Sequence, residues 1–300
     1  MAQRTLQLGP IGIWTTYLDA VPAARAQEVV AELEELGFGA VWCGEAVGRE
    51  ALTNAAVLLA GSKRIVVATG IANIYARDPI AMAAAQNTLA EAYPNRFLLG
   101  LGVSHSHLVE KLRGHVYDKK PVATMRAYLD AMDQAIYRAV PPPSKPLRVL
   151  AALGPKMLQL SAERADGAHP YNTTPAHTAE ARKILGPDPY LCPEQVVIFE
   201  TDAAKARAIA RKFLGIYLGL PNYTNNLLRL GFEEADFANS GSDKLIDALI
   251  AWGDLKTVQS RIHEHHAAGA DHVCVQVLTA DTKTPPMREY RELASTIRRN

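Results

Sequence analysis

Short apolar runs rich in Val and Ile recur along the chain and alternate with longer segments that carry helical signals. Apolar runs of this kind are typical of parallel strands that are buried on both faces. Pro22 opens one helical segment that ends before Gly37, and Asp78-Pro79 combines an N-cap with proline at the first helical position. The eight runs expected to form strands are residues 11–16, 40–44, 65–70, 97–102, 147–153, 167–171, 195–201 and 272–278.

Eight strand–helix alternations favour a closed (β/α)8 TIM barrel over an open doubly wound sheet, because right-handed crossovers repeated eight times close on themselves. A length of 300 residues fits one such barrel with insertions, so residues 1–300 are expected to form a single domain. The insertions are expected after the fourth and seventh strands, at residues 104–146 and 202–271. This extra chain would build a lid or a dimer surface.

The composition excludes several classes of protein. Lys and Arg number 32 against 31 Asp and Glu, so the chain lacks the positive charge of a dedicated nucleic-acid binder. Hydrophobic residues make up 48% of the chain, which excludes an intrinsically disordered protein. The three cysteines are far apart and lack CxxC spacing, which indicates a reducing cytosol. We find no secretion signal at residues 1–10 and no apolar run of membrane-spanning length, so a cytoplasmic protein is expected.

Residues 151–157 form the sharpest local pattern, in which an apolar strand runs through glycine into a helix opened by proline. Glycine lets a ligand approach the backbone, and the first amides of the helix, with the helix dipole, attract an anion. The residues concerned are Leu153, Gly154, Pro155, Lys156 and Met157. An ordinary strand-to-helix turn explains the same pattern, so the motif alone does not establish a site.

The glycines and histidines near residue 100 suggest two further sites, and neither is expected. Gly100-Leu101-Gly102 begins like a dinucleotide-binding fingerprint, but His105 stands at the third glycine position and the strand is the fourth. His105 and His107 form an HxH pair, but the first strand supplies no histidine to complete a metal site. Residues 263–266, His-Glu-His-His, do not match HExxH and fit a solvated helix face. We therefore expect no metal.

Several stretches of the chain resemble the luciferase-like monooxygenase superfamily and, within it, the coenzyme F420-dependent branch of actinobacterial type. The stretches are residues 36–42, 67–73, 94–102 and 154–157 leading to 165–168, and the final strand at 269–276 also fits. The resemblance covers most of the chain. It implies a barrel that holds a flat tricyclic cofactor across the mouth at the carboxyl ends of its strands.

The resemblance also implies which residues hold the cofactor. A non-prolyl cis peptide behind the central ring maps to Gly70-Ile71, with Asn73 close by, and the phosphate maps to residues 153–157 together with His169, Tyr171, Asn172 and Thr173. Pro155 has no amide to donate, so Lys156 and Met157 are the better donors. From its sequence position alone, His169 fits a hydrogen-bonded core histidine equally well.

The chemistry implied by the resemblance is hydride transfer at C5 of the deazaflavin, with a nearby residue handling the proton. His105 matches the position where some relatives carry an acidic catalytic residue. Glu45 stands where other relatives have a histidine, and it fits a proton carrier or an anchor of its loop equally well. Trp14, Tyr17 and Trp42 form a candidate substrate wall, although Trp42 also fits the core.

The expected function is therefore that of an F420-dependent oxidoreductase acting on a small organic substrate. An FMN-dependent two-component monooxygenase on the same fold and a catalytically silent F420-binding protein are the alternatives. The Ala-rich run at residues 81–85 permits close packing of helices, which suggests a homodimer, although the same run also suits packing on the barrel.

Overall fold

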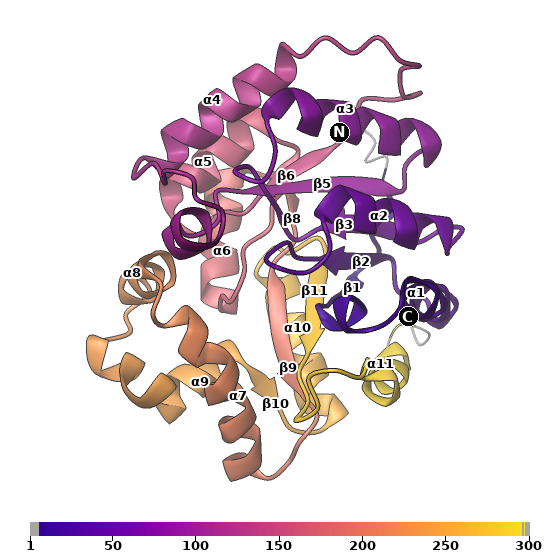
Figure 1. The fold of residues 1–300 in the computed structure, drawn as a ribbon. Helices are drawn as coiled ribbons and strands as arrows, with labels where there is room; N and C mark the ends of the chain where they lie inside the picture. The colour runs from indigo at the N-terminus through magenta and orange to yellow at the C-terminus, as the bar shows by residue number, and fades with distance from the viewer. Residues whose placement is uncertain (1–5, 296, 298–300) are drawn as a thin grey trace.

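The computed structural model describes residues 6–295 and 297 (Figure 1). One parallel sheet runs through this part of the chain, in the order β10-β9-β11-β1-β2-β3-β5-β6-β7-β8, with β4 paired to β5. The strands are β1 (Ile11–Trp14), β2 (Ala40–Cys43), β3 (Val66–Thr69), β4 (Ala72–Asn73), β5 (Phe97–Gly102), β6 (Arg148–Leu150), β7 (Gly167–Ala168), β8 (Tyr190–Leu191), β9 (Glu194–Ile198), β10 (Ala251–Trp252) and β11 (Val273–Val277).

The two ends of the barrel sheet meet through β8 and β9, which are separated by Cys192 and Pro193. On one side, the Cys192 amide donates to the Ala168 carbonyl (2.9 Å). On the other side, the Cys274 amide donates to the Pro193 carbonyl (2.9 Å). The segment 190–198 therefore completes the ring between β7 and β11, and the expected (β/α)8 fold is confirmed.

Helices follow the strands and cover the outside of the barrel (Figure 1). The helix ends expected from the sequence are present: Asp78 caps the start of α3 by accepting from the amides of Ile80 and Ala81, and Gly37 caps the end of α1 with φ 97°. The helices are η1 (Tyr17–Ala20), α1 (Ala23–Leu36), α2 (Ala51–Ala60), α3 (Pro79–Ala92), the π-helix η2 (His107–Leu112), α4 (Pro121–Asp133), α5 (Pro155–Arg164), α6 (Pro175–Leu185), α7 (Ala203–Tyr217), α8 (Pro221–Arg229), η3 (Glu234–Ser240), α9 (Asp243–Leu249), α10 (Leu255–Ala267) and α11 (Met287–Ala294).

All eight expected strands have a counterpart, but the seventh differs in form. Its chain begins at Tyr190 as β8, breaks at Cys192-Pro193 and continues as β9. The two-residue strands β4, β8 and β10 were not expected, because such short pieces carry no periodic pattern. The stretch 1–5, part of the segment searched for a secretion signal, lies outside the described residues.

The core has three parts. A large apolar layer lies between the strands and the surrounding helices, and the barrel interior is filled by a smaller cluster that includes Trp14, Trp42 and Cys274. The third cluster joins Val196 and Ile198 of β9 to α7, α8 and α9, so the long insertion has its own apolar core. Figure 1 shows these helices gathered on one side of the barrel.

The expectation of a solvated face at residues 263–266 is wrong for one residue. His265 is fully buried, and its ring nitrogens lie 2.8 Å from the Thr178 hydroxyl and 2.9 Å from Oε1 of Gln195. These contacts tie α10 to α6 and β9. Within residues 6–295 no helix is long and apolar enough to cross a membrane, and no group of three metal-ligating side chains is assembled.

Candidate active site at the carboxyl ends of the strands

A bulge of one residue interrupts the third barrel strand at the mouth. Val67 and Ala68 pair with Phe97 and Leu98, whereas Ala72 and Asn73 pair with Leu101 and Gly102, so the β3–β4 side holds one extra residue. The peptide bond between Gly70 and Ile71 lies in this bulge and is cis, as the resemblance implies.

The glycines of β5 make room for the bulge. A Cβ at Gly100 would overlap the Thr69 carbonyl, and a Cβ at Gly102 would overlap the Ile71 side chain. The Thr69 hydroxyl also donates to the Gly100 carbonyl (2.7 Å) and accepts from the Gly100 amide (2.8 Å). The glycine pair that begins like a dinucleotide fingerprint therefore serves close backbone packing.

Trp14 and His169 lie on the barrel side of the bulge. The indole NH of Trp14 donates to the Gly70 carbonyl (3.0 Å), and a Cβ at Gly70 would lie 3.1 Å from Nε2 of His169. Nδ1 of His169 lies 2.7 Å from the Cys192 carbonyl, so this nitrogen carries the hydrogen. Burial lowers the pKa of His169 to about 4, and the ring is therefore neutral at pH 7.

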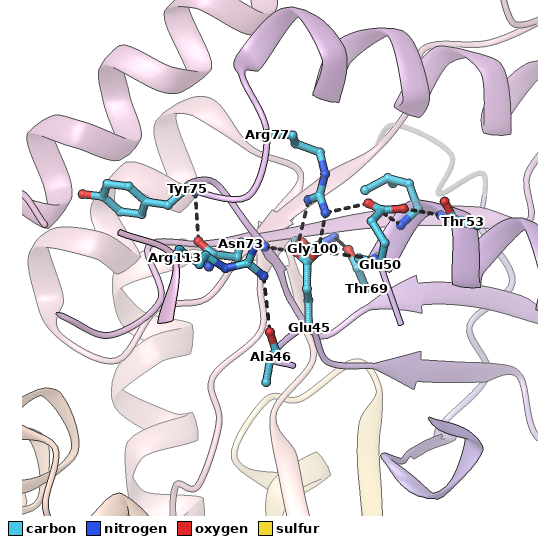
Figure 2. A network of polar contacts seen from close by, with 12 residues as sticks. Glu45, Ala46, Glu50, Thr53, Thr69, Asn73, Tyr75, Arg77, Gly100 and Arg113 are labelled. Carbon is cyan, nitrogen blue, oxygen red and sulfur yellow. Dashed lines mark hydrogen bonds and ion pairs between the residues drawn. The ribbon is translucent and has the colours of Figure 1, made fainter. Parts of the chain in front are cut away.

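Glu45 follows β2 and is held in a network of polar contacts, drawn in Figure 2. Arg77 donates to both carboxylate oxygens, and the Asn73 amide donates to Oε2 (2.7 Å). The Glu45 side chain is only 3% exposed. Of the two roles that the sequence left open, these contacts favour an anchor, because both carboxylate oxygens already have partners.

The residues of the expected anion site lie at the N-terminus of α5 and in the loop after β7. The N-cap of α5 is Gly154, which has no side chain to bond the first amides of the helix. A Cβ built at Gly154 would meet no atom within 4 Å, so the space beside it is open. The Met157 amide donates to the Gly154 carbonyl (3.1 Å), whereas the Lys156 amide has no acceptor among the described residues. Of the two donors expected from the sequence, the structure therefore leaves Lys156 available.

Unpartnered polar atoms gather at and beside the loop after β7. Nine buried side-chain polar atoms lack a hydrogen-bond partner within the described chain, and six of them lie at or beside the loop after β7. Such atoms are rare in folded proteins, so their concentration in one place indicates a site for a polar ligand. The six are Nε2 of His169, Nδ2 and Oδ1 of Asn172, Oγ1 of Thr173, Nδ1 of His177 and Oε1 of Glu194.

Glu194, which sequence analysis did not single out, is a buried acid at the start of β9. Its Oε2 accepts from the Asn172 amide (2.9 Å), and Asn172 adopts φ 57°. Burial raises the pKa of Glu194 to about 8, so the carboxyl is mostly protonated at neutral pH. The available signal was a charged residue at the edge of a buried strand.

The long insertion covers the mouth with aromatic side chains. The His105 ring lies 5.8 Å from that of Tyr223, which lies 5.1 Å from that of Tyr217. The Tyr171 ring packs on both Tyr217 (5.4 Å) and Trp14 (5.1 Å), which extends the cluster to β1. Tyr217 belongs to α7 and Tyr223 to α8, so the long insertion supplies two of the rings in this cluster. The other rings come from the ends of barrel strands that are far away in sequence.

Two polar contacts attach α8 to the rest of the mouth. Asn222 forms a hydrogen bond with His105. Burial lowers the pKa of His105 below its usual value, and this bond partly opposes the shift. Arg229 donates to the Leu153 carbonyl (3.3 Å) and pairs with Glu180 of α6, so a positive charge lies beside the N-terminus of α5.

Of the three residues of the expected substrate wall, Trp14 and Trp42 pair in register on β1 and β2 and share one apolar cluster, whereas Tyr17 lies outside that cluster. Trp14 contacts the bulge and Tyr171, as described above. Tyr17 turns toward the loop after β11, where its hydroxyl lies 3.3 Å from Oγ1 of Thr279. Trp42 is fully buried, donates to Nε2 of His272 (3.1 Å) and stacks on His169 (4.5 Å). Trp42 is thus a core residue, and its expected place in the substrate wall is not supported.

Arg77, Tyr217 and Gln276 were also missed by sequence analysis. Gln276 accepts a hydrogen bond from the Tyr171 hydroxyl (2.8 Å) and was detectable as a polar side chain within an apolar strand. The other two stand in segments that show only helical or loop patterns, and nothing local marks them as parts of the site.

The barrel, with polar side chains gathered at the carboxyl ends of its strands, defines a protein of the (β/α)8 class. The family model described as luciferase-like monooxygenase matches residues 8–272. The chain therefore belongs to this family, and the resemblance noted in its sequence is confirmed.

Known relatives share the full length of the chain. A Mycobacterium tuberculosis protein that is assigned by inference as a coenzyme F420-dependent oxidoreductase is 27% identical, with 96% of this chain and 98% of that protein covered. An F420-dependent secondary alcohol dehydrogenase in complex with an F420–acetone adduct has TM-score 0.77 and 14% identity, with 96% and 97% covered. The oxygenating constituent of a diketocamphane monooxygenase from Pseudomonas putida, in complex with FMN, has TM-score 0.68 and 14% identity, with 95% of each chain covered.

Proposed function

We propose that the protein is an F420-dependent oxidoreductase that transfers a hydride between the deazaflavin and a small organic substrate. The observation that carries the proposal is the group of six unpartnered buried polar atoms at and beside the loop after β7, together with the open N-terminus of α5. Two of the six, Nδ2 of Asn172 and Oγ1 of Thr173, are donors, and such donors together with a helix N-terminus suit a phosphate. The name of the Mycobacterium tuberculosis relative supports F420 as the molecule that carries it.

The residues that would hold the cofactor fall into two groups. The Lys156 amide, the Thr173 hydroxyl and the Asn172 amide group would bind the phosphate. Gly70 and Ile71, in the bulge, would support one face of the ring system, with Asn73 fixing the chain just beyond. When bound, F420 supplies a hydride donor and acceptor at C5.

We assign the proton to His105 and a positioning role to Glu45. His105 lies at the mouth beside Tyr223, and burial lowers its pKa, which favours a neutral ring able to accept a proton near neutral pH. The Glu45 carboxylate is bonded by Arg77 and by the Asn73 amide. The aromatic rings of Trp14, Tyr217 and Tyr223 would exclude water and favour an apolar or weakly polar substrate.

The first test is to titrate the purified protein separately with F420 and with FMN, following cofactor fluorescence. We expect binding of F420 to be the tighter. Tighter binding of FMN would instead favour a two-component monooxygenase. The similar diketocamphane monooxygenase structure, which contains FMN, suggests this alternative. Binding of neither cofactor would refute the proposal.

A pair of threonine variants tests the phosphate site. Thr173→Val removes a buried hydroxyl that has no partner in the described chain, so the apoprotein should lose no stability while F420 binding weakens by about tenfold. Thr178→Val is the matched control. The Thr178 hydroxyl forms a hydrogen bond with His265, so its loss should destabilise the apoprotein but leave the affinity for F420 unchanged. Unchanged F420 affinity in Thr173→Val would show that the cofactor phosphate does not bind at this hydroxyl.

Activity is tested by mixing the protein anaerobically with reduced F420 and a panel of carbonyl and alkene acceptors. Recovery of the oxidised F420 absorption band is the expected result. A protein that binds F420 tightly but returns no oxidised cofactor with any acceptor would be a silent F420 carrier.

We extend the proposal to the setting of the protein, a homodimer in the cytoplasm. Cys43, Cys192 and Cys274 are buried and form no disulfide, which suits a reducing compartment. Ile80 of α3 is 60% exposed next to the Ala-rich run at 81–85, which suits a helix packed against a second copy. Sedimentation equilibrium of wild type and Ile80→Glu tests the dimer, and a monomeric wild type would exclude it.

A further inference from the structure

Arg77 is the centre of the network in Figure 2, and none of the sequence motifs above gives it a role. Its guanidinium donates to both oxygens of Glu45, and Nη2 also lies 2.5 Å from Oε1 of Glu50. Only 12% of the Arg77 side chain is exposed. The Arg77 carbonyl accepts from the Tyr128 hydroxyl (2.9 Å), so α4 fixes the backbone of the same residue.

Glu45 links Arg77 to the bulge. Its amide donates to the Ile71 carbonyl (3.2 Å), and its carboxylate accepts from the Asn73 amide (2.7 Å). One residue of the loop after β2 therefore holds the chain on both sides of Ala72. The position of residues 71–73 depends on where the Glu45 side chain is held, and Arg77 holds it.

We infer that Arg77 is a positioning residue for the cofactor-facing bulge and that it acts through Glu45. The inference rests on the proposed function, which places the cofactor ring against Ile71. A carboxylate with 3% exposure needs a partner charge, because an unpaired buried charge is strongly unfavourable. Without Arg77, the charged Glu45 side chain would turn toward water, and the Asn73 amide would lose its acceptor.

An effect of Arg77 through Glu45 can be distinguished from a general effect on folding. Arg77 has a second carboxylate partner, Glu50, which is 45% exposed and caps α2 through the amides of Leu52 and Thr53. A purely structural role would involve Glu50 and α2 as much as Glu45. A positioning role requires Glu45 alone.

The experiment measures F420 affinity, the absorption band of bound F420 and the melting temperature of the apoprotein for wild type and four variants. The variants are Arg77→Met, Arg77→Met/Glu45→Gln, Arg77→Lys and the control Glu50→Gln. Gln at position 45 keeps an oxygen for the Asn73 amide but needs no partner charge. The double variant should therefore restore what the single variant loses.

We expect Arg77→Met to weaken F420 binding about tenfold and to shift the absorption band of the bound cofactor. The double variant should return to within about threefold of wild type with the original band, and Arg77→Lys should lie between. Glu50→Gln should bind F420 like wild type even if its melting temperature falls.

Two results would overturn the inference while leaving the proposed function intact. The first is wild-type affinity in Arg77→Met, and the second is a double variant that binds no better than the single one. If wild type itself binds no F420, the proposed function fails and this inference fails with it. The wild-type titration therefore separates the two failures.

Discussion

Trp14 donates its indole hydrogen to the carbonyl oxygen of Gly70 at 3.0 Å, which ties the end of β1 to the bulge after β3. β2 lies between them in the sheet and also contacts the bulge, because the Gly70 amide donates to the Cys43 carbonyl (2.8 Å). A Cβ at Gly44 would lie 3.0 Å from the Trp14 ring, so Gly44 leaves space for the indole to cross. The bulge is thus held by Trp14 from within the barrel and by Glu45 from the adjacent loop.

Trp14→Phe should destabilise the protein and weaken cofactor binding. The variant leaves the buried Gly70 carbonyl without its donor, which costs about 1–3 kcal/mol of unfolding free energy. Urea denaturation and F420 titration measure the two effects. Trp252→Phe is the matched control, because its indole donates to Asp247 of α9, a helix that contributes no residue to the proposed site, so F420 affinity should stay unchanged. Equal F420 affinities of wild type and Trp14→Phe would count against a role of this contact in the site.

The architecture was predictable because buried parallel strands are marked by Val and Ile runs and the helices between them by Asp-Pro and Gly signals. Each of these signals is local. The strands β8 and β10 have two residues each, and pairing with long neighbours forms them, so no local pattern announces them.

The site was predictable in part. The bulge lies at Gly70-Ile71, as the resemblance implies, and α5 begins after Gly154, as the strand–glycine–proline pattern predicts. The direction of a side chain on a strand could not be predicted. Neighbouring residues on a strand face opposite sides of the sheet, and both faces of this barrel sheet are apolar, so the pattern does not show which residues point inward. Trp42 was for this reason placed in a substrate wall, although its ring packs on His169 inside the barrel.

Partners from distant segments could not be predicted. The roles of Glu45 depend on Arg77, which stands 32 positions later, and the cover of His105 depends on Tyr223 in the insertion. Both contacts arise from packing between elements, and no periodic pattern records which elements will meet.

Gly102→Ala should disturb the bulge from the side of β5. The added methyl group would overlap the Ile71 side chain, which must then move or push the bulge outward. We expect a loss of about 1–3 kcal/mol in unfolding free energy, as for other overpacked cores, together with weaker F420 binding. Gly219→Ala is the control, because the nearest atom to its added methyl lies at 3.7 Å. Unfolding curves that coincide for Gly102→Ala and wild type would contradict the close packing described here.

Two variants of α8 should move the pKa of His105 in opposite directions. Asn222→Ala removes the hydrogen bond that raises this pKa, so the pKa should fall further below its usual value. Tyr223→Ala removes the ring that covers His105, so water returns and the pKa should rise toward its usual value. Titration of the His105 ring protons by NMR, assigned with His105→Gln, measures both shifts. Movement of the two pKa values in the same direction would show that α8 does not control this histidine as described.

Buried neutral histidines should make the protein sensitive to mild acid. Burial lowers the pKa of His272 to about 4, and Nε2 accepts the indole hydrogen of Trp42, which a protonated ring cannot do. The unfolded chain titrates near the usual value of about 6.5, so it binds more protons than the folded chain below that pH. The stabilising contribution of neutral His272 is therefore complete above about pH 6.5 and is lost progressively as the pH falls toward 4.

At pH 5 this loss amounts to about 2 kcal/mol for one such histidine. Urea unfolding between pH 7.5 and pH 5 should therefore show a steep fall in stability for wild type and a shallower one for His272→Gln. The slope should not vanish, because burial also lowers the pKa of His169 to about 4 and that of His265 to about 3. His263→Gln, a change at an exposed position of α10, should keep the wild-type slope. A His272→Gln protein with the full wild-type slope would show that this histidine is already protonated in the folded state.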